Sequence, residues 1–279
     1  MSKQTKAGFK KELLAYFRTS TFLTIALVMV GVAILTPLLI VGMGTFMDSM
    51  SDLYEEMGTD VSGMTEALSE SASIGVQSAM ETVSGVGLIV MLITLNKFAG
   101  GEQKKRSIII PRSAGLRSFS YVFPKFIIYP LSALLLSIAA AFAAWLVSIP
   151  LFENNNLYAD SVLLAGVLIG VTLMLYVCFH LALGTATGKA GMSCAVCITV
   201  SFLLPSILAQ VIDGHMYNPF TMEYLINPVL NAKSLSGTML QDIFVTMGFA
   251  IGIMILTFLV ALFVQNAKRI DNSGDEIDL

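Results

Sequence analysis

The chain has 279 residues, of which 56% are hydrophobic and 13% are charged, and its formal net charge is -3 at pH 7. A soluble globular domain has about 25% charged residues, so this composition excludes an ordinary soluble protein and predicts an integral membrane protein. The small negative charge gives no reason to expect nucleic acid as a partner.

Residues 1–20 precede the first long apolar run and predict a helix that lies in the headgroup plane of a membrane. Its apolar side chains share one helical face and its lysines lie on another: Phe9, Leu13, Tyr16 and Phe17, against Lys6 and Lys10. A positively charged membrane anchor is the simpler alternative. The apolar run that follows is too long for a signal peptide and lacks a small-residue cleavage site, so we expect it to stay attached.

Six stretches are long and apolar enough to cross a bilayer, which takes about 20 residues. They cover residues 22–43, 74–95, 126–149, 162–183, 192–212 and 243–264. The second is the weakest, because Gln77 and Glu81 lie in its first half. The expected fold is a single all-α transmembrane domain of six helices, preceded by the interfacial helix.

Between the first two spans, residues 44–73 form an acidic segment with an apolar stripe at alternating spacings of four and three. The stripe contains Met43, Met47, Met50, Tyr54, Met57, Val61, Met64 and Leu68. It predicts a helical extension above the membrane, packed on the second span or on a second subunit. The alternative is that its flexible methionines form an adaptable surface for amphipathic cargo.

Residues 96–125, between the second and third spans, hold seven of the sixteen basic residues around an apolar core, "IIIP". A segment this long and charged, with such a core, is typical of a short helix or elbow that contacts a soluble partner. A basic loop that faces lipid headgroups is the alternative. We expect Lys97 and Lys125 to mark the membrane boundary, with their aliphatic stems snorkelling.

The basic residues also indicate orientation. Fifteen of the sixteen lie before the first span, in the second-to-third or fourth-to-fifth connections, or in the tail of residues 265–279, and the exception is Lys233. The positive-inside rule therefore places both termini in the cytoplasm. We expect a multi-pass protein of a bacterial or archaeal plasma membrane.

Motifs for catalysis are missing from the sequence. "GTATGKAG", from Gly184, resembles a phosphate loop, but the spacing is wrong and Ala190 stands where the magnesium-binding hydroxyl belongs. We therefore expect no ATP hydrolysis, no bound cofactor and no catalytic residue in this chain. A metal site at Asp213, His215 and Glu223 is conceivable on residue type alone, but we expect none.

The fifth span carries a series of polar side chains around Pro205: Ser193, Thr199, Ser201, Ser206 and Gln210. They predict one face of a polar pathway, although such side chains can equally form hydrogen bonds between helices. No Asp, Glu, Lys or Arg is expected at the middle of a span. That absence disfavours an ion relay and favours an amphiphilic peptide, a lipid or a hydrophobic drug as cargo.

The amphipathic N-terminal helix, the six spans and "GGEQKKRSIIIPRSAGLRSFSYVFPKFI" together resemble the permease subunit of a type-two ABC exporter. The sequence departs from that pattern at Ser107-Ile108, where Gly-Thr is common. The resemblance implies that residues 102–112 contact the ATPase, with residues 184–191 as a second contact and residues 213–242 as a partly inserted outer hairpin. The implied coupling residues are Glu102, Lys104, Lys105, Arg106, Ser107, Ile108, Ile109, Ile110, Pro111 and Arg112.

The same resemblance implies the partners. A dimer of cytoplasmic ATPase subunits would bind ATP and Mg²⁺, and a second permease subunit, identical or different, would complete the pathway within membrane lipid. Two other classes remain open on the sequence. A noncatalytic membrane scaffold or sensor would use the basic loop to bind a signalling protein, and a secondary transporter would normally show an inverted repeat, which this chain lacks.

Overall fold

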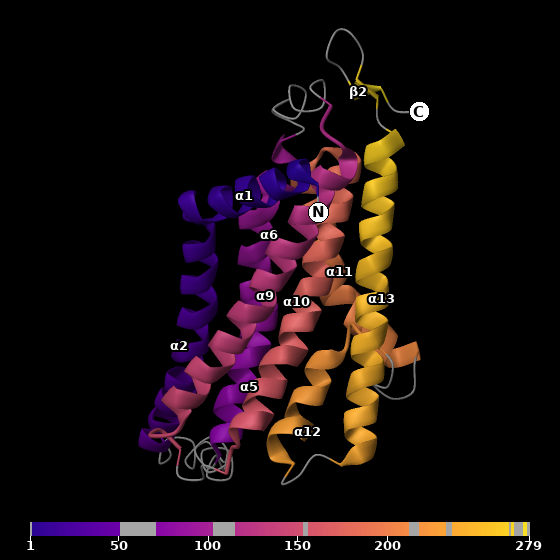
Figure 1. Cartoon of the computed structure of the whole chain (residues 1–279). Coiled ribbons are helices and arrows are strands. Elements are labelled where there is room, and N and C mark those ends of the chain that lie inside the picture. The colour runs from indigo at the N-terminus through magenta and orange to yellow at the C-terminus, as the bar shows by residue number, and fades with distance from the viewer. Residues whose placement is uncertain are drawn as a thin grey trace.

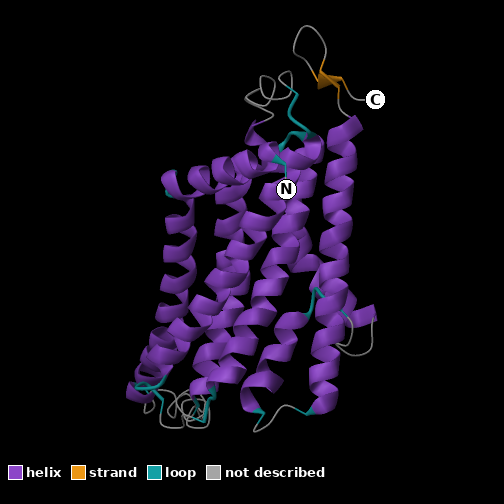
Figure 2. Cartoon of the chain, in the orientation of Figure 1, coloured by secondary structure: helices purple, strands orange, loops and turns teal. Residues whose placement is uncertain are grey.

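The structure is a computed structural model of the full chain, and it describes residues 2–50, 71–102, 115–152, 156–211, 218–232, 236–267, 269–270 and 276–277. Almost every described residue is helical (Figure 2). The helices are α1 (Lys3–Arg18), α2 (Thr21–Ser49), α5 (Ala72–Thr82), η1 (Val83–Gly87), α6 (Leu88–Asn96), η2 (Lys97–Gly101), α9 (Ser118–Ser148), α10 (Ala159–Thr187), α11 (Ala190–Val211), η3 (Met222–Leu225), α12 (Ile226–Asn231) and α13 (Gly237–Ala267). A two-residue pair, β1 (Arg269–Ile270) and β2 (Glu276–Ile277), follows α13.

Within the described part of the chain, six helices are long and apolar enough to cross a membrane, as the sequence predicted. They are α2, the continuous helix Ala72–Gly101 formed by α5, η1, α6 and η2, and then α9, α10, α11 and α13. Their length and composition make the chain an all-α protein with the layout of a multi-pass membrane protein. The helices run side by side with alternating direction, so α1 and the C-terminal end of α13 lie at the same end of the bundle (Figure 1).

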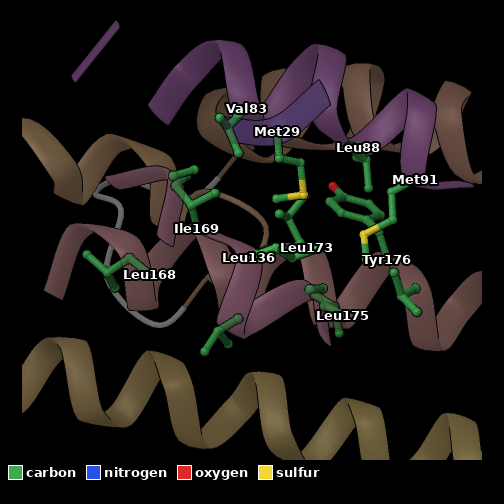
Figure 3. Close-up of a cluster of buried hydrophobic side chains, with 14 of the residues drawn as sticks. Met29, Val83, Leu88, Met91, Leu136, Leu168, Ile169, Leu173, Leu175 and Tyr176 are labelled. Carbon is green, nitrogen blue, oxygen red and sulfur yellow. The ribbon is translucent and has the colours of Figure 1, made fainter. Parts of the chain in front are cut away.

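The α10 helix forms the centre of the bundle. Of its most apolar window 72% is buried, against 22% for α2, α11 and α13. Helix α10 packs on α9, α11 and α13, while α2 packs on α9 and α5. The core between them is built from apolar side chains of α2, η1, α6, α9 and α10, as Figure 3 shows for Met29, Val83, Leu136 and Leu173.

The first helix, α1, lies across the end of the bundle (Figure 1) and packs on α9 and α2. The side chain of Thr5 forms a hydrogen bond with Ser120 at 3.1 Å, and Gly8 lies so close that a Cβ there would be 2.6 Å from the Ser120 carbonyl oxygen. The side chains of the apolar face predicted for α1 do not share one environment. Tyr16 points into the bundle and is buried, while Leu13 and Phe17 are about half exposed.

The predicted loop at residues 184–191 is mostly helical. Helix α10 continues to Thr187 and α11 begins at Ala190, because Gly188 ends α10 in the left-handed conformation (φ 66°) with its N–H bonded to the Gly184 carbonyl. Gly184 lies within α10 because η2 crosses there: a Cβ at Gly184 would lie 2.7 Å from the Ala99 Cβ. The glycines that resembled a phosphate loop thus serve a helix end and a close helix crossing.

The boundaries of other predicted segments also shift. The helix of the second span continues through Gly101, and α9 begins at Ser118, so the two ends of the predicted 96–125 segment are helical. Residues 103–114 lie outside the described part of the chain. The methionine stripe enters α2, which continues to Ser49, but residues 51–70 are likewise outside the described ranges.

Candidate functional site

Among the described residues, two groups of polar side chains are candidates for a functional site, and the first surrounds Lys125 near the α1 end. Lys125 projects from α9 and is fully buried. Its Nζ donates hydrogen bonds to the Phe98 carbonyl oxygen at 2.7 Å, to Glu102 Oε2 at 2.6 Å and to the Tyr121 hydroxyl at 3.1 Å. Phe98 belongs to the π-helical turn η2, and π-helical turns of this kind occur frequently at functional sites.

Helix α1 joins the same cluster through a second buried carboxylate. Glu12 is 2% exposed, and its Oε1 lies 4.0 Å from Lys125 Nζ. The Tyr129 hydroxyl donates to Glu12 Oε2 at 2.6 Å. From the surface, Lys11 binds Glu102 and lies 3.4 Å from Glu12. The cluster therefore ties α1, α9 and the end of the Ala72–Gly101 helix to one another by charge.

Aromatic rings enclose this ionic cluster. The Tyr16 ring meets the Tyr129 ring edge-on at 5.2 Å, and the Phe98 ring stacks on Tyr129 at 4.8 Å. Apolar surroundings strengthen charge interactions and raise the cost of an unpaired charge. Burial alone would raise the pKa of Glu102, but the charges of Lys125 and Lys11 outweigh it and lower that pKa to about 2. Glu102 is therefore ionised throughout the physiological pH range.

The prediction that Lys125 snorkels to the membrane boundary is wrong, because its ammonium group is buried and paired. Lys97 behaves differently, since its exposed side chain donates to Thr19 Oγ1 at 2.6 Å. The sequence reasoning also missed Glu12. The spacing of Tyr121, Lys125 and Tyr129, four residues apart on one helical face, was the available signal for a buried polar stripe.

Of the ten predicted coupling residues, the structure describes Glu102 alone. The other nine, Lys104, Lys105, Arg106, Ser107, Ile108, Ile109, Ile110, Pro111 and Arg112, lie outside the described residues, so their role stays a prediction. Glu102 precedes them by two positions in the sequence and turns its carboxylate toward Lys125, with 19% of its side chain exposed. It therefore connects the predicted coupling segment to the ionic cluster.

The second polar group lines a cavity of about 250 Å³ between the Ala72–Gly101 helix, α10, α11 and η3. Ser84 Oγ donates to Glu223 Oε2 at 3.1 Å, and Gln77 Nε2 donates to Glu81 Oε1 at 2.9 Å. Ser84 and Tyr176 lie near the middle of the Ala72–Gly101 helix and of α10, so the cavity lies about halfway along the bundle.

Two of the five predicted pathway residues, Ser201 and Ser206, line this cavity. Ser193 is elsewhere: its Oγ donates to the His180 carbonyl oxygen and contacts His180 Nδ1, each at 2.8 Å. That pair joins α10 to α11 by hydrogen bonds. Thr199 is exposed, and the side chain of Gln210 lies outside the described residues.

One carboxylate of the cavity corrects a prediction. Glu81 lies in the first half of the Ala72–Gly101 helix, as the sequence placed it, and is exposed. Glu223 was grouped with Asp213 and His215, yet it reaches back to Ser84. Within the described ranges no group of three or more His, Cys, Asp or Glu side chains could hold a metal ion, and Asp213 and His215 fall outside those ranges.

Glu223 reaches Ser84 because the segment before α13 folds back into the bundle. Asn218, Thr221 and Met222 are buried, and η3 and α12 pack against α10, with α12 also on α5 (Figure 1). No family model, curated protein or solved structure matches the chain. Arguments about its function therefore rest on these two polar groups and on the helix layout.

Proposed function

We propose that the chain is the membrane-spanning subunit of an ATP-driven exporter that resembles type-two ABC permeases. The observation that carries the proposal is the ionic cluster around Lys125, which ties α1 and α9 to Glu102. Glu102 lies two positions before residues 104–112, which we call the basic segment. A force applied to that segment by an ATPase would pass through Glu102 into both helices, because buried ion pairs do not separate easily.

The proposed orientation places the α1 end of the bundle in the cytoplasm of a cell membrane. Among the described residues, the basic side chains of α1 and those of Lys97, Arg117 and Lys189 lie at that end, in agreement with the positive-inside rule. In this orientation α1 would lie in the headgroup plane, with Leu13 and Phe17 facing the acyl chains. The inward-folded η3 and α12 would then face the outer side and separate the cavity from the exterior.

The proposed mechanism is alternation between two arrangements of the bundle. Two cytoplasmic ATPase subunits bind ATP and Mg²⁺ and close, and the basic segments of two permease subunits follow them. The ionic cluster makes α1, α9 and the Ala72–Gly101 helix move together, which changes access to the cavity that borders the same helix. Cargo moves because it binds the two arrangements with different affinity.

Affinity purification of the tagged chain from its native membrane in mild detergent tests this function. We expect a phosphate-loop ATPase to copurify in stoichiometric amount, to be identified by mass spectrometry and to hydrolyse ATP. A clean preparation that contains no ATPase, even after cross-linking in the membrane, would contradict the exporter function and favour a scaffold that binds another cytoplasmic protein.

Charge reversal of the basic segment gives a second prediction. The triple substitution K104E/K105E/R106E should abolish copurification of the ATPase, because it replaces three cations of the proposed docking surface with anions. The elution profile and melting temperature of the permease should stay unchanged. Reversal of two basic residues in the tail, K268E/R269E, is the control, and equal loss of the ATPase in both variants would refute a specific role for residues 104–106.

A further inference from the structure

The cavity halfway along the bundle is acidic and has no basic counterpart. Glu81 and Glu223 both line it. None of its lining residues is Lys or Arg, and neither carboxylate forms an ion pair in the described part of the chain. Glu81 lies in a helix long enough to span a membrane, where acidic side chains are costly and are characteristic of substrate or ion pathways.

An unpaired hydroxyl group supplies independent support for a ligand. Tyr176 is 2% exposed, lines the cavity, and its hydroxyl forms no hydrogen bond with any described residue. Tyr176 and Glu223 line the same cavity, so this buried hydroxyl lies in the wall that also holds the carboxylate. Buried polar groups nearly always have a partner, and a bound ligand would supply one.

The other side chains that line the cavity indicate which chemical class of ligand would fit it. Phe202, Phe220 and Tyr224 join Tyr176 around the carboxylates. Aromatic faces attract organic cations, whereas a hard metal ion such as Ca²⁺ requires about six to eight oxygen ligands. Two carboxylates among four aromatic rings therefore suit an ammonium group carried on an organic molecule better than a bare metal ion.

We propose that this cavity binds the ammonium group of a cationic amphiphile, which is the cargo class of the exporter. The role as cargo rests on the proposed function, while the binding site itself does not. The cavity of about 250 Å³ is smaller than typical small-molecule sites of roughly 300–1,000 Å³. It therefore holds the cationic group, and the rest of the molecule extends past the exposed Glu81 and Tyr224 at its edge.

A binding titration on the chain without any ATPase tests the site. The full-length protein is placed in phosphatidylcholine nanodiscs and titrated with dansylaminoethyl-trimethylammonium, and fluorescence anisotropy is read against empty nanodiscs. The neutral analogue, in which a tert-butyl group replaces the trimethylammonium group, measures the affinity without charge. We expect the cation to bind about tenfold more tightly or better than its analogue.

Variants of the cavity test whether the preference for the cation over its neutral analogue arises there. In E81Q/E223Q the two affinities should converge, and Y176F should weaken cation binding several-fold while the neutral analogue is unaffected. Asp160→Asn, an exposed acidic residue at the start of α10, should change neither. If the double variant does not fold, as judged by its melting temperature, the single E223Q and Y176F variants decide by the same comparison.

Equal binding of cation and analogue, or a preference that survives in the folded variants, would overturn the site. This result is separate from the copurification experiment. Cation-selective binding by a chain that recruits no ATPase would keep the site and refute the exporter, while an ATPase partner without charge preference would keep the exporter and refute the site.

Discussion

Replacement of Lys125 by methionine is expected to lower the free energy of unfolding by about 3–5 kcal/mol, because it removes the buried cation of the cluster and leaves Glu102 and Glu12 with the exposed Lys11 alone. Glu102 and Glu12 would face each other across an apolar side chain, enclosed by the rings of Phe98 and Tyr129. Methionine fills a similar volume, so the effect reports the lost charge and hydrogen bonds more than a cavity. The midpoint of thermal unfolding in detergent measures it.

The matched control is Lys11→Met, which removes the other cation bound to Glu102. Lys11 has a side chain that is 55% exposed, so its pair should contribute less than about 1 kcal/mol. A Lys125→Met protein as stable as Lys11→Met would show that the buried cluster contributes little. The double variant E102Q/K125M should be less destabilised than the sum of the two single variants, because one carboxylate no longer requires a cation.

The pH dependence of Lys125→Met follows from the same contacts. With Lys125 present, the pKa of Glu102 is about 2, below its usual value of 4.5. A carboxyl group whose pKa is lowered in the folded protein stabilises the fold at pH values above its usual pKa. That stabilisation is lost as the pH falls toward 2. Without Lys125, only Lys11 opposes the effect of burial on the pKa of Glu102, so the carboxylate takes up a proton at higher pH than in the unaltered protein. The stability gap between the two proteins should narrow as the pH is lowered from 7 to about 5.

The six spans could be predicted from the sequence because bilayer length and apolar composition are local properties. The contacts inside the bundle were harder to predict, because they join residues that are distant in sequence. Lys125 resembled a boundary lysine until Glu102 and Glu12 were placed beside it. Glu223 resembled part of an outer loop because nothing local indicates that residues 218–232 fold back to Ser84.

Two glycines also show that long-range contacts cannot be predicted from local sequence. Gly184 and Gly188 belong to one pattern that resembles a phosphate loop, but their structural roles are unrelated. Gly188 adopts a left-handed conformation at the end of α10, while Gly184 faces Ala99 on another helix. A helix end is a local event that the sequence can indicate. A backbone crossing requires knowledge of which two helices meet, and that knowledge comes only from the fold.

The crossing at Gly184 carries the other large effect that we expect. Gly184→Ala should lower the free energy of unfolding by about 1–3 kcal/mol, the usual cost of overpacking. The new methyl group would lie 2.7 Å from the Ala99 Cβ and 2.9 Å from its carbonyl oxygen. Backbone atoms cannot turn aside as a side chain can, so η2 as a whole must shift away from α10. Thermal unfolding in detergent measures the loss.

Gly252→Ala in α13 is the control, since a Cβ there meets nothing within 4 Å. It should be neutral or slightly stabilising, because alanine favours helix over glycine by up to about 1 kcal/mol. Equal effects at Gly184 and Gly252 would mean that the crossing has room for a methyl group.

A shift of η2 would also move the Phe98 carbonyl oxygen, which accepts a hydrogen bond from Lys125 and lies one residue before Ala99. The Gly184→Ala and Lys125→Met effects should therefore be less than additive when combined, because each disturbs the same group of contacts. Additive effects would show that the crossing at Gly184 and the ionic cluster around Lys125 are energetically independent. Non-additive effects would show that the contact between η2 and α10 holds the ionic cluster in place, and with it the helix end from which the basic segment begins.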